Sequence, residues 1–149
     1  MARFNGIAQT AEVALSAAVA RTVIQMVAPA NHRVVLTGWG VYFDGTSANA
    51  EPVQVEIVLQ TTAGTMSALT PAKKDTSLPE TLLTTAQHSA SAEPTTTDVL
   101  DVIECHPQGG YEKAAPLMTE IVVGGGKRIG IRCTAPAGVN VRAKLEFEE

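Results

Sequence analysis

The stretch from Val53 to Gln60 reads VQVEIVLQ, and its pattern decides the fold class. Apolar side chains occupy every second position, at Val53, Val55, Ile57 and Leu59. Polar side chains lie between them, at Gln54, Glu56 and Gln60. Because successive side chains of a strand point to opposite faces, this pattern predicts a strand with one packed face and one face in water. Such strands are typical of antiparallel sheets.

Two further stretches, 128–134 and 139–147, repeat this alternation. Their apolar positions are Ile129, Ile131 and Cys133 in the first stretch, and Val139, Val141, Ala143, Leu145 and Phe147 in the second. Thr and Val, which favour strands, are frequent, and Gly or Pro interrupts the chain at short intervals. The sequence therefore predicts an all-β protein, an antiparallel β-sandwich or jelly roll of about eight to nine strands.

Other strands are expected at 22–28, 33–43, 98–105 and 119–123. Residues 11–20 fit either a helix or a short strand, and we favour the strand because Val13 and Leu15 alternate with smaller residues.

At most one short helix is expected, at 78–86, where Pro79 suits the first turn. The turn Gly124–Lys127 is expected to join 119–123 to 128–134 as a hairpin.

The length of 149 residues corresponds to one domain. We expect residues 1–12 to form an N-terminal arm and residues 13–149 to form a single β-sandwich domain. The hydrophobic share of 45% and the charged share of 17% exclude long-range disorder. The first six residues lack the basic and apolar regions of a signal peptide, so we expect the chain to stay in the cytoplasm where it is made.

Residues 33–43 have apolar or small side chains on both faces of the expected strand. One face carries Val35, Thr37, Trp39, Val41 and Phe43, and the other carries Val34, Leu36, Gly38, Gly40 and Tyr42. Gly38 and Gly40 leave a flat strip that another group can approach closely. Two interpretations remain open: a central strand beneath a loop, or an oligomer interface formed by the second face.

Motifs that carry chemistry are scarce in this sequence. The net charge is −4 and the basic residues are scattered, so we expect no nucleic acid as a partner. No run approaches the roughly 18 apolar residues that a membrane helix needs, so we expect no membrane as a partner. A strand is expected after Gly124–Lys127, whereas a phosphate-binding loop opens a helix. The three histidines lie far apart, so we expect no metal, no cofactor and no enzymatic activity.

The two cysteines and the acidic C-terminal residues have simple interpretations. Cys133 shares its face with apolar residues and is expected to be a small buried side chain. A disulfide to Cys105 would require neighbouring strands, and the reducing compartment disfavours it. Glu146, Glu148 and Glu149 are expected to be solvated.

Four blocks of the chain resemble small virion proteins of tailed bacteriophages. The blocks are residues 27–62, Val102–Tyr111 with its HPQGGY segment, Ile121–Ala135 with its GGGKRIGIRCTAP segment, and the ending Asn140–Glu149. The blocks are spread from residue 27 to residue 149, so the resemblance spans most of the chain, and they consist of turn and strand motifs. Within this group the chain is similar to head decoration, or cement, proteins.

The resemblance implies a β-sandwich or jelly-roll module that decorates and stabilises the capsid exterior without catalysis. Its partners would be the major capsid protein lattice and itself, as a homotrimer, and its location the surface of the virion. No functional residue can be carried over, because the resemblance includes no reactive motif. From the residues, we predict a trimer contact through the second face of strand 33–43, and capsid docking through Arg3 and Phe4 of the arm.

Two alternatives belong to other functional classes. A carbohydrate- or receptor-binding jelly-roll module of the tail or fibre would need exposed aromatic side chains, for which Trp39, Tyr42 and Tyr111 are the candidates. An enzyme on a β-barrel would need a pocket with converging polar groups.

Overall fold

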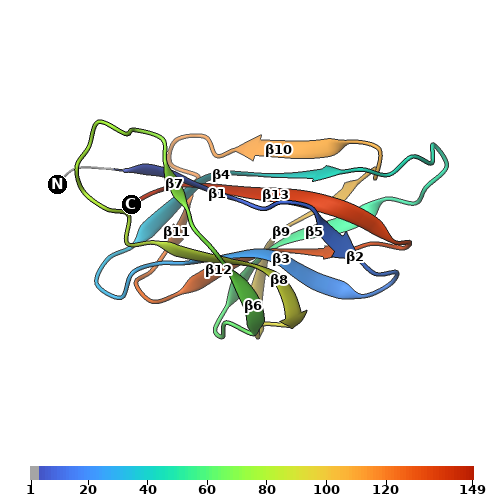
Figure 1. Cartoon of the computed structure of the whole chain (residues 1–149), viewed down its shortest axis with the longest axis horizontal. Helices are drawn as coiled ribbons and strands as arrows, with labels where there is room; N and C mark the ends of the chain where they lie inside the picture. Colours follow the sequence, from blue (N-terminus) through green and yellow to red (C-terminus); the bar gives the residue numbers. More distant parts are fainter. Residues whose placement is uncertain (1–3) are drawn as a thin grey trace.

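The computed structural model describes residues 4–149 and contains two packed antiparallel sheets (Figure 1). The first sheet has the order β10-β4-β13-β1-β7, with β11 also paired to β4 and β2 to β13. Its strands are β1 (Asn5–Gln9), β2 (Val13–Leu15), β4 (Val34–Phe43), β7 (Ala72–Lys73), β10 (Gly110–Ala114), β11 (Ile121–Val123) and β13 (Val139–Glu148). This confirms the predicted all-β sandwich.

The second sheet has the order β6-β8-β3-β12-β5-β9. Its strands are β3 (Ala20–Val27), β5 (Val53–Gln60), β6 (Thr65–Leu69), β8 (Thr85–Ala92), β9 (Thr96–Cys105) and β12 (Arg128–Thr134). The 13 strands within residues 4–149 exceed the eight to nine predicted. That part of the chain contains no helix long and apolar enough to cross a membrane.

The core lies between the sheets and follows the predicted alternation. Ile57 of β5 stands opposite Ile131 of β12, and both side chains are fully buried. Val141, Leu145 and Phe147 of β13 are also fully buried, in the facing sheet. Period-two patterning therefore identified the inward faces of the central strands correctly.

The predicted helix at 78–86 is wrong, because this segment uses its backbone groups for tertiary hydrogen bonds. Lys73 Nζ donates to the carbonyl oxygens of Leu78 (2.6 Å) and Glu80 (2.7 Å). The Glu149 carboxylate accepts from the backbone N–H groups of Leu83 (2.9 Å) and Thr84 (2.7 Å). The expected solvated position of Glu149 is wrong for the same reason, since only 4% of its side chain is exposed.

The predicted hairpin across Gly124–Lys127 is also wrong. Strand β11 pairs with β4 in the first sheet, whereas β12 pairs with β3 and β5 in the second, so the turn carries the chain between sheets. It packs tightly against the connection between β3 and β4: a Cβ on Gly125 would lie 2.6 Å from the carbonyl oxygen of Ala30. Only glycine therefore fits at position 125, because a side chain would overlap the backbone of Ala30.

The expected N-terminal arm is part of the sheet where the structure describes it. Strand β1 lies between β13 and β7, and Ala8 is fully buried. The backbones of Phe4 and Glu149 exchange two hydrogen bonds of 2.9 Å, so the first described residue lies beside the last (Figure 1). Residues 4–9 are thus held by strand pairing, while Arg3 lies outside the described residues.

Candidate functional site

A side of the sandwich bounded by β9, β10 and β11 exposes an unusual share of apolar surface. We call these three strands and the connection 115–120 the open side. Ten large apolar side chains are exposed within residues 4–149, and seven of them lie here: Val99, Leu100, Val102, Tyr111, Leu117, Met118 and Val122. Concentrated apolar exposure of this kind marks interaction sites in soluble proteins.

Strand β9 forms the long edge of the open side. It spans ten residues and pairs with β5 on one side only. An edge strand presents unpaired backbone N–H and C=O groups that can pair with another chain. Its register shifts twice against β5, next to Leu100 and Thr97, so its side chains do not follow a simple alternation. Val99, Leu100 and Val102 are between 43% and 49% exposed.

A groove of about 240 Å³ separates β9 from β10 and β11. Leu36 and Trp39 of β4 and Leu100 of β9 contribute apolar lining. Lys113 Nζ lies 2.7 Å from Asp101 Oδ2, and this ion pair links the edges of the two sheets. The hydrogen bond to Asp101 raises the pKa of Lys113, so the lysine is charged at neutral pH.

The turn between β10 and β11 projects two apolar side chains from the open side. The backbone N–H of Thr119 donates to the carbonyl oxygen of Pro116 over 3.0 Å, which closes the turn. Leu117 is 88% exposed and Met118 is 95% exposed. Met118 has a φ of 75°, a left-handed conformation that is strained for a bulky side chain. We call Leu117 and Met118 the apolar tip.

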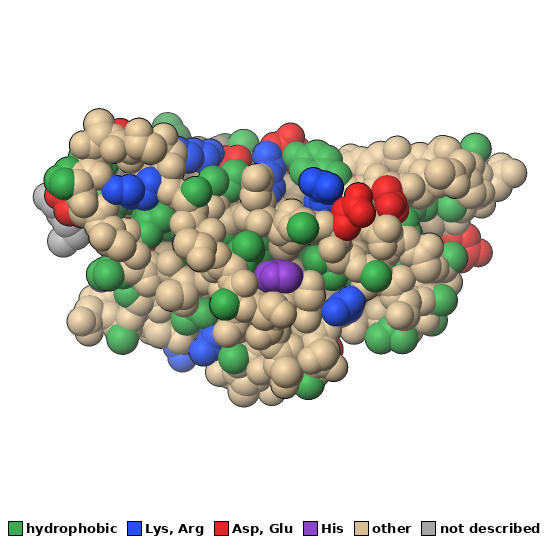
Figure 2. Space-filling model, viewed as in Figure 1, with side chains coloured by type: hydrophobic (Ala, Val, Ile, Leu, Met, Phe, Trp, Pro, Cys, Tyr) green, Lys and Arg blue, Asp and Glu red, His purple; other side chains and the backbone are tan. Residues whose placement is uncertain are grey.

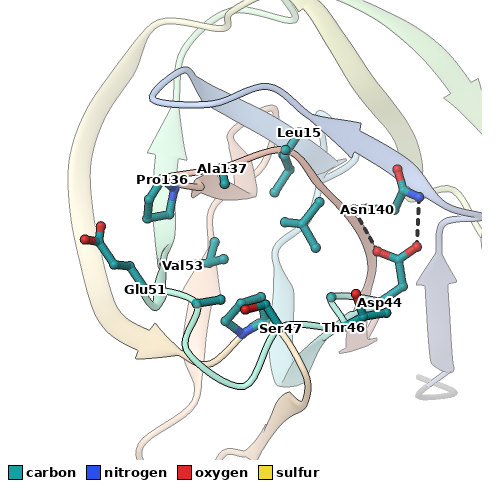
Figure 3. A pocket seen from close by; sticks show the side chains of 14 residues that line it. Leu15, Asp44, Thr46, Ser47, Glu51, Val53, Pro136, Ala137 and Asn140 are labelled. Carbon is teal, nitrogen blue, oxygen red and sulfur yellow. Dashed lines mark hydrogen bonds between the residues drawn. The ribbon is translucent and has the colours of Figure 1, made fainter.

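A second cavity, the end pocket, lies at one end of the sandwich and has a volume of about 690 Å³ (Figure 3). The loop 44–51 and the loop 136–138 form much of its wall, and Leu15, Val53 and Val139 add apolar side chains. It has 14 lining residues, and the charged ones are Asp44 and Glu51.

Asp44 is fixed at the rim of the end pocket. Its carboxylate accepts hydrogen bonds from Asn140 Nδ2 (2.8 Å) and from the Asn140 backbone N–H (2.9 Å), as the dashed lines in Figure 3 show. The Asn140 side chain and then its backbone lower the pKa of Asp44. Glu51 lies on another part of the rim and is exposed.

The predicted oligomer interface on β4 does not form one face. Gly38 stands opposite Glu146 of β13 and Leu36 stands opposite Phe147, so Thr37 between them has no partner. One extra residue turns the following side chains to the other face. Val34 and Leu36 therefore point into the core, together with Trp39.

The outward part of that expected interface is covered by charged side chains. A Cβ on Gly40 would lie 3.0 Å from both Glu112 Cγ and Lys144 Cε. Lys144 pairs with Glu112, which raises the pKa of the lysine, and it lies 3.5 Å from Glu146. The glycines thus admit side chains of neighbouring strands, and Tyr42 alone of the five predicted residues is exposed, at 39%.

Charge is mixed elsewhere on the surface. On the face that Figure 2 shows, Lys and Arg side chains lie in small groups, some of them beside Asp and Glu side chains. Trp39 is 4% exposed and its ring packs on Tyr111 at a centroid distance of 5.3 Å, so it offers no exposed aromatic platform.

The cysteines are free and buried. Cys105 and Cys133 lie on β9 and β12, which flank β5, and burial raises the pKa of both thiols. Within residues 4–149 no group of three or more His, Cys, Asp or Glu side chains is placed to hold a metal ion.

Sequence reasoning missed the open side, although two signals were present. Residues 98–105 carry Asp98, Asp101 and Glu104 at intervals of three, which a strand with one packed face would not show. The turn after Pro116 carries two bulky apolar residues, Leu117 and Met118, and Met118 takes a left-handed position where glycine or asparagine is usual.

The open side, its apolar tip and the end pocket are three features through which this chain can contact other molecules. Comparisons of the chain with protein-family models, with curated proteins and with solved structures find no match.

Proposed function

We propose that this chain is a structural protein of a tailed-bacteriophage virion. It decorates the capsid exterior, binds the lattice of the major capsid protein and acts as a homotrimer. The observation that carries the proposal is the concentration of exposed apolar side chains on the open side. The resemblance of the sequence to head decoration proteins gives that surface its partner.

The open side has two properties that favour binding to another protein. Burying one of its valine or leucine side chains contributes about 1.5–3 kcal/mol at full burial. Strand β9 adds unpaired backbone groups, which can extend the second sheet by a strand from the partner.

Binding of this kind stabilises a capsid through mass action. A protein that binds the assembled lattice and not its separated subunits shifts the equilibrium toward the lattice. Several linked contacts raise the effective affinity well above that of a single contact. A trimer of modest individual affinity therefore suffices as a cement.

The test uses capsids of the phage that encodes this chain, prepared without it. Purified chain is added back, and binding is measured by co-sedimentation and cryo-electron microscopy. Wild-type chain should bind the outer surface. The double variant Val99→Lys/Val102→Lys, which places two cations on β9, should bind at least about tenfold more weakly.

The matched control is Leu83→Lys, which alters an apolar side chain of similar exposure (58%) outside the open side. It should bind like wild type. Failure of the wild-type chain to bind, or equal binding by the β9 variant, would contradict the proposal.

A further inference from the structure

We infer that β9 binds an extended segment of its partner protein that carries apolar and basic side chains two residues apart, and that this segment joins the second sheet as a further strand. The inference rests on the proposed function, because it names the kind of segment that the open side takes from the capsid lattice. Three observations carry it: the uncovered backbone of β9, the side chains on its outward face, and the charge of the open side.

The backbone edge of β9 that points away from β5 is uncovered. Among the described residues, the backbone of residues 96–105 forms no backbone hydrogen bond outside its pairing with β5. Two register shifts disturb the first half of the strand, but Asp101–Cys105 stand opposite Val53–Ile57 without a shift. Because this part of the edge is regular, it can pair with another extended chain.

The outward face of this regular edge presents an apolar side chain beside an acidic one. Val102 stands opposite Glu56, and Glu104 stands opposite Gln54. Glu56 alternates with core residues of β5 and therefore points outward, where it pairs with Arg132. Val102 is 49% exposed and Glu104 is also exposed. An added strand therefore meets a valine and, two residues away on the same face, a carboxylate.

The net charge of the chain is concentrated on the open side. Of the 15 acidic and 11 basic residues of the chain, five acids and one base lie on the open side. They are Asp98, Asp101, Glu104, Glu112, Glu120 and Lys113. The open side thus carries a net charge of −4, equal to that of the whole chain, and the rest of the chain is balanced. A partner segment that binds here gains from positive charge.

Two of the acids on β9 are unpaired. Asp101 forms an ion pair with Lys113 over 2.7 Å. Asp98 and Glu104, in contrast, are exposed and form no side-chain hydrogen bond or ion pair within the described part of the chain. Basic side chains of an added strand can therefore form charge-assisted hydrogen bonds with these carboxylates, in addition to the backbone pairing.

The same charges disfavour a second copy of β9 as the added strand. If two copies of β9 paired, their acidic side chains would lie next to one another on the joined sheet. Like charges on neighbouring strands destabilise the pairing. The acids therefore attract a basic segment and repel a copy of the same chain, which makes the edge selective.

Fluorescence anisotropy with synthetic peptides and the full chain tests the inference. The probe is a labelled peptide, blocked at both ends, in which threonine alternates with lysine and valine in turn. The comparison peptide has glutamate in place of lysine. The wild-type chain should bind the lysine peptide at least about tenfold more tightly than the glutamate peptide. Methylation of the backbone nitrogens of the lysine peptide keeps its charges but prevents strand pairing, and should weaken binding by at least about tenfold.

A charge reversal on β9 gives the sharpest result. The variant Asp98→Lys/Glu104→Lys should bind the glutamate peptide more tightly than the lysine peptide, and thermal unfolding confirms that it is folded. The matched control, Glu51→Lys, reverses an exposed carboxylate outside the open side and should keep the wild-type preference.

Hydrogen–deuterium exchange locates the bound peptide. The lysine peptide should slow exchange in residues 101–105 and leave β6 unchanged, which is the uncharged strand at the other edge of the same sheet. Equal binding of the lysine, glutamate and methylated peptides, an unchanged preference in the charge-reversed variant, or protection of β6 instead of β9 would overturn the inference.

Capsid binding separates this inference from the proposed function. If the chain binds capsids but does not bind the lysine peptide, the added strand is wrong and the proposed function stands. If the lysine peptide binds β9 but the chain does not bind capsids, the added strand stands and the proposed function fails.

Discussion

The two sides of the sandwich end in different ways. On the side opposite the open side, β6 at the edge of one sheet passes directly through Thr70 and Pro71 into β7 at the edge of the other. Residues 74–84 then return to the second sheet, fastened by Lys73 and Glu149. We call this the closed side. Among residues 4–149, its exposed large apolar side chain is Leu83, against seven on the open side.

The comparison shows that position in the sheet decides exposure more than composition does. Strands β4 and β9 both have ten residues, and β4 is the more apolar of the two. Yet β4 lies between neighbours and is largely buried except at Tyr42, whereas β9 lies at an edge and leaves its valines in water. An edge without a covering segment is the place where a second molecule can bind.

The largest expected effect on the free energy of unfolding comes from a substitution at the floor of the open-side groove. Leu36 is 2% exposed and Leu100, at the rim of the same groove, is 43% exposed. Leu36→Ala should lower the free energy of unfolding by about 2–5 kcal/mol, because it leaves a cavity in the core. Leu100→Ala should cost less than about 1 kcal/mol. Equal losses in urea unfolding would show that the rim is as well packed as the floor.

The hydrogen bonds from Leu83 and Thr84 to Glu149, which hold the closed side, should contribute less to the free energy of unfolding. Glu149→Ala leaves the backbone N–H groups of Leu83 and Thr84 without their acceptor, so it should cost about 1–2 kcal/mol in urea unfolding. Glu149→Gln keeps an acceptor and should cost less. A loss from Glu149→Ala no larger than that from Glu149→Gln would mean that the carboxylate does not hold residues 74–84.

This fastening should weaken in acid. Burial raises the pKa of Glu149, but hydrogen bonds from Thr84, Leu83 and His32 outweigh it and bring the pKa below the ordinary value of 4.5. The stabilisation is therefore complete above about pH 4.5 and is lost as the pH falls through the lowered pKa. The protection of the Thr84 amide against exchange, relative to that of the Ile131 amide in the core, should fall in acid. The fall should be larger in wild type than in Glu149→Gln.

The ion pair of the open side, between Lys113 and Asp101, should contribute least to the free energy of unfolding. Its contribution should be lost in base rather than in acid. The pKa of Lys113 is raised above 10.5, so its contribution is complete below that pH and is lost as the pH rises through the raised pKa. Because the pair is partly exposed, Lys113→Met should cost at most about 1 kcal/mol at neutral pH. Urea unfolding at pH 7 and pH 11 checks this, and a larger difference between wild type and variant at pH 11 would contradict it.

The sequence predicted the interior of this fold well and its edges poorly. Alternation in 53–60, 128–134 and 139–147 reflects burial on one face, which is a property of the strand itself. The strands β1, β6, β7, β8 and β10 were missed, because they are polar or short and their structure depends on pairing partners distant in the chain.

The candidate site depended on features that a linear pattern does not contain. The unpaired Thr37 reverses the faces of β4, and no residue in 33–43 indicates it. Gln60 was expected in water, yet its side-chain amide donates to Thr22 Oγ1 and it is 2% exposed. In both cases another segment decides the environment, and its identity follows only from the topology.

Hydrogen–deuterium exchange of the chain, free and bound to capsids, tests most directly whether the open side is the binding surface. If the open side binds the capsid, binding slows exchange in β9 and in residues 115–123, and leaves exchange in residues 70–84 of the closed side unchanged. Slower exchange confined to residues 70–84, with β9 unaffected, would contradict it.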